Sequence, residues 1–149
     1  MEIVQRLSER GSSEESLVEI EAAIGAKLPT DYRDFMTGTN GGRPDPSVFA
    51  YDTKKGRKDS RVRYFLTLDP TEARYTVPVF MDRYAGRYPP LTFPIACDSF
   101  GNLILLDVGA RSIGSVYFWD HEKEDMNKAS WKNIFIISPS FTEFLISLK

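Results

Sequence analysis

Hydrophobic residues recur every three or four positions near the start of the chain, and this spacing predicts an amphipathic helix over 12–26. The apolar stripe consists of Leu17, Ile20 and Ile24. The glutamates expected to point largely away from this stripe are Glu15, Glu19 and Glu21. We expect Ser12 and Glu15 to form a capping box at the start, and Gly25 to end the helix because glycine tolerates a left-handed backbone.

A second helix is predicted to begin near Pro29, since proline suits a first-turn position that needs no N–H donor. Its inward stripe is expected to contain Tyr32, Phe35 and Met36. The following Asn40-Gly41-Gly42 is a strong stop signal, because two glycines accept the positive φ that a helix exit commonly needs.

After the glycine pair the hydrophobic period changes to two, which is typical of strands. We expect strands at 48–51 and 62–68 on either side of a basic loop. The next segment, 70–90, is ambiguous: Pro70 and Pro78 are each placed to open a short helix.

Three further strands are predicted at 92–97, 103–108 and 115–119, with turn-forming residues between them. Short connections join antiparallel neighbours, so we expect a meander and not parallel crossover units. A last strand is predicted at 134–137. A C-terminal helix should follow, with Ser140 and Glu143 as a capping box. Its buried face is expected to contain Phe141, Phe144, Leu145 and Leu148.

This order of elements predicts an α+β fold in which N-terminal and C-terminal helices pack around a mainly antiparallel sheet. We expect a single domain over 1–149, with its core at about 12–148. Of the 149 residues, 42% are hydrophobic, so the chain has enough apolar material for a core without disulfide or metal staples.

The composition limits the cellular compartments and the classes of binding partner that we expect for this chain. A formal charge of −2 and a pI near 5.5 argue against general attraction to nucleic acid or to an anionic membrane. The single cysteine, Cys97, excludes an internal disulfide and suits a reducing compartment. Residues 1–6 lack the pattern of a secretory signal, and no apolar run approaches the length of a membrane span. We therefore expect a cytoplasmic protein with no membrane partner.

The only histidine, His121, offers two kinds of chemistry. A zinc site would have to combine it with Cys97 and carboxylates such as Asp98 or Glu122, and none of these has metal-ligand spacing. A Cys97–His121 nucleophilic pair, oriented by Asp98 or Asp120, is formally possible. Because Cys97 shares a predicted strand face with apolar neighbours, we interpret it as a small core residue. We therefore expect no catalytic, cofactor-binding or metal-binding residues.

Charged residues gather in two segments. The run 54–63 is strongly basic and has aromatic neighbours, which would suit nucleic-acid binding, yet it falls where a solvated hairpin loop is usual. We consider a loop that meets an acidic protein surface the better interpretation. Glutamates dominate the predicted first helix and could steer a basic partner.

Five short motifs, in order, resemble the SMI1/KNR4 branch of the SUKH superfamily. They are Leu28-Pro29-Thr30-Asp31-Tyr32, Asn40-Gly41-Gly42, Ala96-Cys97-Asp98-Ser99-Phe100-Gly101-Asn102, Trp119-Asp120-His121-Glu122 and Ser140-Phe141-Thr142-Glu143-Phe144-Leu145. The resemblance covers nearly the whole chain, although 43–90 matches nothing diagnostic. It implies a single α+β domain without enzymatic activity. Many bacterial members are immunity proteins that bind a cognate toxin in the cytosol, often a nuclease, whereas fungal relatives act as signalling or cell-wall regulators.

The resemblance and the charge pattern together identify candidate partner-binding residues. These are Glu14, Glu15, Glu19, Asp98, Asn102, Asp120, His121 and Glu122. For the last five, the alternative is that they hold the fold, with Asp98, Gly101 and Asn102 forming a tight turn and Trp119 anchoring the sheet. The leading hypothesis is inhibition of a toxin by direct binding. The alternatives are a regulatory or scaffold adaptor and, less favoured, a nucleic-acid-binding domain.

Overall fold

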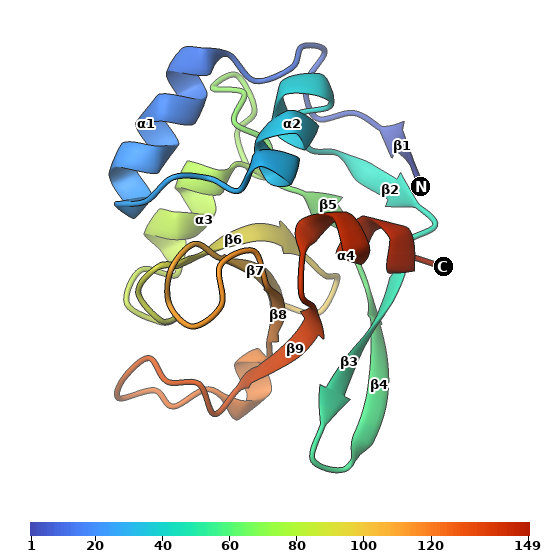
Figure 1. The fold of residues 1–149 in the computed structure, drawn as a ribbon, viewed down its shortest axis with the longest axis vertical. Helices are drawn as coiled ribbons and strands as arrows, with labels where there is room; N and C mark the ends of the chain where they lie inside the picture. Colours follow the sequence, from blue (N-terminus) through green and yellow to red (C-terminus); the bar gives the residue numbers. More distant parts are fainter.

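A five-stranded antiparallel sheet forms the centre of the computed structural model, which describes residues 1–149 (Figure 1). Its strands, in spatial order, are β5 (Tyr64–Phe65), β6 (Thr92–Cys97), β7 (Leu103–Asp107), β8 (Val116–Trp119) and β9 (Ile134–Ser138). Chain order and spatial order are the same, so the predicted meander is confirmed. Every residue of β6, β7 and β8 is buried, which means that both faces of the middle strands are covered.

Four helices surround the sheet: α1 (Glu14–Ile24), α2 (Thr30–Gly38), α3 (Val77–Arg83) and α4 (Phe141–Ser147). Figure 1 shows α1 beside α3, and α2 beside the C-terminal α4. The expected α+β class, with helices from both ends of the chain around a mainly antiparallel sheet, is confirmed. None of these helices is long and apolar enough to span a bilayer.

One hydrophobic core joins the layers, and aromatic rings supply much of it. The 29 buried apolar residues form a single cluster, which is why the chain folds as one domain and not two. At its centre, Tyr32 of α2 meets Phe93 of β6 at 5.7 Å and Phe141 of α4 at 5.2 Å, both edge to face. Such pairs contribute about 0.5–1.5 kcal/mol each beyond their buried area. Tyr32 therefore ties two helices to the sheet.

The start of α1 differs from our expectation by one residue. Ser13, and not Ser12, is the N-cap: its hydroxyl accepts a hydrogen bond from the Ser16 N–H at 3.1 Å. Ser12 is buried instead and donates to Asn40 Oδ1 at 2.7 Å. Adjacent serines look alike to a capping pattern, so the tertiary contact of Ser12 decided between them.

The helix ends agree with the turn chemistry. Gly25 caps α1 with φ 83°, and Asn40, Gly41 and Gly42 follow α2 with φ of 58°, 85° and 116°. Ser140 caps α4 by accepting from the Glu143 N–H at 3.1 Å, and donates to Glu143 Oε2 at 3.1 Å, so the predicted capping box is confirmed.

The two prolines of the ambiguous segment 70–90 have different roles. Pro78 lies in the first turn of α3 as expected. Pro70 opens no helix, because the Asp69 carboxylate accepts the Thr71 N–H and closes a turn there.

The expected basic loop is instead a strand. β3 (Val48–Thr53) pairs with β4 (Gly56–Arg61) in a two-stranded hairpin whose turn is Lys54-Lys55. All residues of β4 are exposed or only partly buried, so the strand has no apolar alternation that a sequence pattern could reveal. Figure 1 shows this hairpin projecting from the body of the molecule.

Two other strand predictions need correction. The predicted strand 62–68 reaches only β5, since Leu66 still bonds to Ile95 but Thr67 turns away to pair with Thr76. At the N-terminus, β1 (Glu2–Gln5) pairs with β2 (Arg43–Asp45), which the sequence did not indicate. β1 is almost wholly exposed, so it carries no buried-strand pattern. A 3₁₀ turn, η1 (His121–Lys123), follows β8.

Candidate functional site

The turn between β6 and β7 is organised by one buried carboxylate. Asp98 is 4% exposed, and its Oδ1 accepts hydrogen bonds from the N–H groups of Phe100 and Asn102 at 2.8 and 2.9 Å. Gly101 has φ 89°, which explains the glycine, whereas Asn102 has no positive φ. The tight turn is confirmed, with Asn102 contributing its side chain.

The Asn102 side chain extends this turn to the end of β8. Its Nδ2 donates to Asp98 Oδ2 at 2.8 Å, and its Oδ1 accepts from the His121 backbone N–H at 3.0 Å and lies 2.6 Å from His121 Nδ1. Because Oδ1 only accepts, His121 carries a proton on Nδ1. Three of the predicted site residues therefore form one connected chain of hydrogen bonds.

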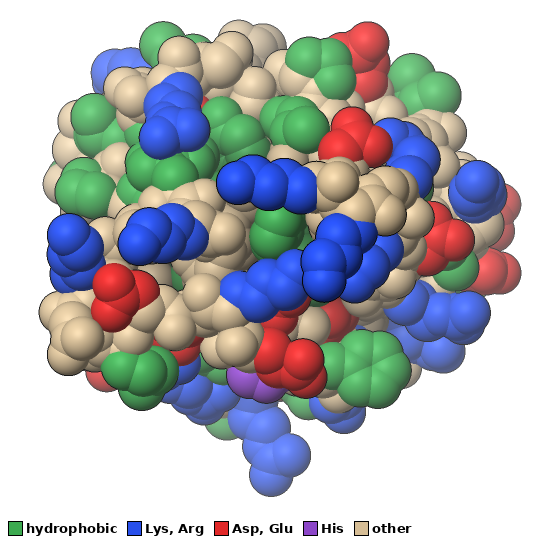
Figure 2. All heavy atoms as spheres, turned by 90° about the horizontal axis from the view of Figure 1, so that it is seen from below, with side chains coloured by type: hydrophobic (Ala, Val, Ile, Leu, Met, Phe, Trp, Pro, Cys, Tyr) green, Lys and Arg blue, Asp and Glu red, His purple; other side chains and the backbone are tan.

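Asp98, Asn102, Asp120 and Glu122 line a single groove of about 650 Å³ between the β3–β4 hairpin and this end of the sheet. Its floor contains Tyr51, whose ring stacks on Phe118 at 4.2 Å. We call this the carboxylate groove; its other charged lining residues are Lys58, Asp59, Arg61 and Lys123. Figure 2, seen from below, shows the histidine beside acidic side chains, with Lys and Arg side chains over much of the same face.

The pKa of Tyr51 reflects the carboxylates that gather at this groove. Burial raises the pKa of its hydroxyl, and the negative charges of Asp120, Asp98, Asp59 and Glu122 raise that pKa further. Sequence reasoning missed Tyr51, and it missed Phe100, which lines the groove while its side chain is 72% exposed. No local signal identifies Tyr51, because its place depends on where the hairpin lies relative to the sheet. Phe100 lies between Asp98 and Asn102 in the turn motif, and that position is the signal that could have identified it.

The acidic helix residues lie elsewhere. Glu14 forms a two-pronged ion pair with Arg33 of α2, at 2.7 and 2.8 Å, and Glu15 is exposed. Glu19 lines a different groove, between α1 and α3. Four of the eight predicted residues therefore line the carboxylate groove, and the three glutamates lie on the α1 side of the molecule (Figure 1). His121 contacts the groove residue Asn102 without lining the groove itself.

Cys97 lies in the core, and its chemistry follows from that position. Its side chain is 6% exposed, and burial raises the pKa of the thiol to about 11, so the thiolate is scarce at neutral pH. No three side chains of the His, Cys, Asp and Glu types are grouped so as to hold a metal ion.

The basic side chains of the run 54–63 are split between two faces of the hairpin where the run forms β4. Successive residues of β4 point to opposite faces, so the cations of 57–61 do not form one track. Arg57 pairs with Asp52 at 2.6 Å, and the Arg63 guanidinium lies over the ring of Tyr75, 5.6 Å from its centroid. Arg57 and Arg63 are therefore already engaged within the fold.

Trp119 anchors the sheet to the segment after α3, as the sequence led us to expect. It is fully buried, and its indole N–H donates to the Arg87 carbonyl at 3.0 Å. The guanidinium of Arg87 in turn binds both carboxylate oxygens of Glu124 at 2.8 Å. These contacts give the Trp-Asp-His-Glu strand end an architectural role alongside its place at the groove.

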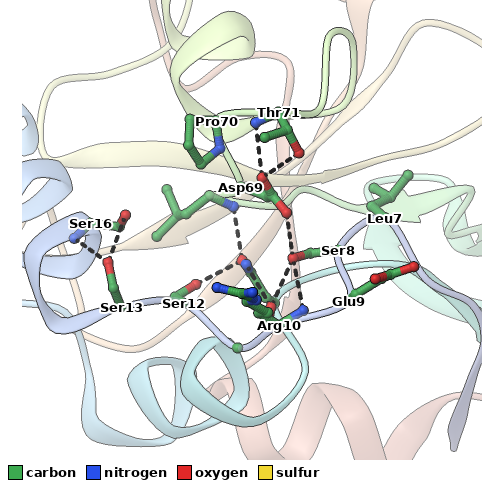
Figure 3. Close-up of a pocket in the computed structure, with 13 residues that line it drawn as sticks. Leu7, Ser8, Glu9, Arg10, Ser12, Ser13, Ser16, Asp69, Pro70 and Thr71 are labelled. Carbon is green, nitrogen blue, oxygen red and sulfur yellow. Dashed lines mark hydrogen bonds between the residues drawn. The ribbon is translucent and has the colours of Figure 1, made fainter.

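A polar hollow of about 580 Å³ lies between the N-terminal loop 7–13 and residues 68–71 (Figure 3). Its polar groups bond to each other: Ser8 donates to Asp69 at 2.7 Å, and this bond, with others from Thr71, lowers the Asp69 pKa. Buried Asn40 accepts from Ser12 and from the Leu68 N–H, and donates to the Arg10 carbonyl. These hydrogen bonds thus join the N-terminal loop, the segment that follows α2 and residues 68–71.

Comparisons with known proteins identify one family and one relative. Residues 11–147 match the profile of the SMI1/KNR4 family (SUKH-1). The chain is also similar to the SPbeta prophage-derived uncharacterized protein YokK of Bacillus subtilis (strain 168), with 31% identity over 150 residues. That alignment covers 92% of this chain and 74% of the relative.

Proposed function

The chain belongs to the SMI1/KNR4 family (SUKH-1), and on that premise we propose that it is a non-catalytic protein-binding module that neutralises a toxin in the cytoplasm. The binding surface is the carboxylate groove, and the partner is a cognate toxin protein. No cofactor takes part. The family resemblance implies the immunity role, and the geometry of the groove supports its location.

The observation that carries this proposal is the rigid placement of charged and aromatic groups at one end of the sheet. Hydrogen bonds from Asp98 through Asn102 to His121 hold the rim of the groove before any partner arrives. A preorganised surface loses little conformational entropy on binding. Phe100 stands exposed within a ring of charges, as aromatic anchors of protein interfaces do.

The carboxylates of the groove, unlike its Lys58, Arg61 and Lys123, suit a nuclease toxin. A nuclease surface that binds phosphates is basic, and carboxylates such as Asp120 and Glu122 can occupy the positions of phosphate groups. Association would then be fast at low salt and slower at high salt, because exposed charges are screened.

Co-expression with a toxin domain, sought first among the genes beside this one, tests the proposal. We expect the wild-type chain to restore growth and to co-purify with the toxin. Phe100→Ala should weaken the complex by about tenfold or more, since it removes an exposed aromatic anchor. Ile113→Ala is the matched control, because Ile113 is equally exposed, at 71%, and does not line the groove.

Three results of this experiment would contradict the proposal. Continued killing without complex formation would reject the immunity function. Full protection with an unchanged affinity of the Phe100 variant would move the binding surface away from the groove. A stable complex with a host protein that is not a toxin would instead favour the regulatory adaptor.

A further inference from the structure

A second groove, between α1 and α3, has an apolar floor. It measures about 720 Å³ and lies where Figure 1 shows the two helices side by side. Ile20 and Leu68 form the buried part of the floor, and Val79 and Met81 of α3 are half-buried along it. Exposed Ala23 leaves space at the α1 wall, because its side chain is small. Apolar surface between two helices is thus open to a partner.

The rim of this groove carries only negative charge. Its ionisable lining residues are Glu19, Asp69, Glu72 and Asp82, and no Lys or Arg lines it. None of these four carboxylates forms an ion pair with a basic side chain. The whole chain has a formal charge of only −2, so this concentration is local.

The position of Asp82 is not explained by stability. It lies in the last turn of α3 (Val77–Arg83), where the helix dipole disfavours a carboxylate. Asp82 makes no side-chain hydrogen bond within the protein that would offset this cost, and Glu19 on the opposite wall makes no side-chain hydrogen bond either. Both charges are exposed and remain available to an external cation.

We propose that the α1–α3 groove binds a cationic amphipathic helix of a partner protein. The apolar stripe of such a helix would cover the floor, and its Lys or Arg residues would meet the carboxylates on the rim, as in helix-in-groove recognition. The floor between α1 and α3 is apolar and its rim is acidic, which is the pattern that such a helix complements. The inference goes beyond the proposed function, because it concerns a separate surface and does not require the partner to be a toxin.

The test uses the full chain and a fluorescein-labelled peptide of about 18 residues made of Leu, Ala and Lys, with Leu at helical spacing. Fluorescence anisotropy should show binding that weakens as salt rises. The same composition with scattered Leu positions should bind at least about tenfold more weakly, because it presents no apolar stripe. A peptide with Glu in place of Lys should not bind.

Two pairs of variants separate the groove from general charge. Glu19→Lys/Asp82→Lys should lower the affinity at least about tenfold, whereas Glu2→Lys/Asp34→Lys, with the same change in net charge, should stay within about threefold. Ala23→Gln should also weaken binding by filling the groove. Its control is Ala22→Gln, at an exposed neighbour that does not line the groove. Circular dichroism and the thermal midpoint check that each variant is folded.

The proposal is overturned if the amphipathic peptide does not bind, if both peptide arrangements bind equally, or if both charge variants weaken binding equally. These results are independent of the toxin assay. Loss of peptide binding would leave toxin protection by the carboxylate groove standing, and failure of toxin protection would leave the peptide result standing.

Discussion

At the scale of single residues, Asp107 shows how one buried carboxylate holds a loop. It is fully buried at the end of β7, and its oxygens accept hydrogen bonds from four successive backbone N–H groups, Gly109 to Ser112, at 2.7–3.0 Å. The Tyr117 hydroxyl donates to it at 3.0 Å. Burial acts to raise the pKa of Asp107, but the backbone donors together hold that pKa below its ordinary value of 3.8.

Asp107→Asn should destabilise the fold by about 2–4 kcal/mol, because an amide NH₂ group cannot accept the hydrogen bonds that one carboxylate oxygen accepted. The folded-state pKa of Asp107 is depressed, so its stabilisation is present above the unfolded-state pKa and is lost as pH falls through the folded-state value. Urea unfolding should therefore show a gap between wild type and variant that is full near pH 6 and shrinks below about pH 4.

Asp34→Asn provides the comparison for this experiment. Asp34 is exposed on α2 and its side chain makes no hydrogen bond, so the unfolding free energy should change by less than about 0.5 kcal/mol. A gap for Asp107→Asn that is independent of pH would show that the carboxylate charge is not the stabilising feature.

At the scale of elements, Glu21 couples α1 to the start of α2. We expected it to point away from the core, but it is 7% exposed. Its Oε2 accepts the Leu28 N–H at 2.8 Å, and its Oε1 lies 3.3 Å from the Arg33 guanidinium. Position 21 lies next to buried Ile20 on the helix and faces the segment between α1 and α2, so its carboxylate can accept a hydrogen bond from that segment.

Glu21→Ala should lower the unfolding free energy by about 1–3 kcal/mol, because the buried Leu28 N–H loses its acceptor. Glu19→Ala is the matched control, since Glu19 is an exposed glutamate of the same helix with no hydrogen bond or ion pair in the fold. Urea titration of both variants measures the difference. Equal effects of the two changes would show that Glu21 does not link the helices.

The hairpin shows why one element escaped prediction. A strand is visible in a sequence when one of its faces is buried, since burial imposes the period of two. β4 pairs with β3 but buries neither face, so its charged residues resembled a loop. The hydrogen bonds of the pair, and not its side chains, define it as a strand.

At the scale of the whole molecule, the single core predicts cooperative unfolding. Trp119 is fully buried within it, and Trp131 packs edge to face on Tyr117 of β8 at 5.1 Å. Tryptophan fluorescence should therefore report the sheet, while far-ultraviolet circular dichroism reports the helices as well. We expect the two urea midpoints to coincide, as in two-state unfolding of a single domain over 1–149. Loss of helical signal before the fluorescence change would indicate that α1 and α2 form a separate unit.

Local patterns were sufficient for much of this protein. Helical spacing located α1 and α2, alternation and turn residues located the strands of the meander, and Ser140 with Glu143 marked α4. These features depend on neighbours a few positions apart, whose chemistry the chain displays directly. The Asp98 turn belongs to the same class, because its donors lie two and four residues away.

The grooves and the contacts that join separate segments depend on residues that are distant in the chain. Ser60 reaches Asp98 across 38 positions, and Arg87 reaches Glu124 across 37. A periodic pattern reports whether a side chain is buried, but it does not report which segment covers it. Folding brought the hairpin to the end of the sheet and α3 beside α1, and these placements made surfaces that no stretch of sequence contains.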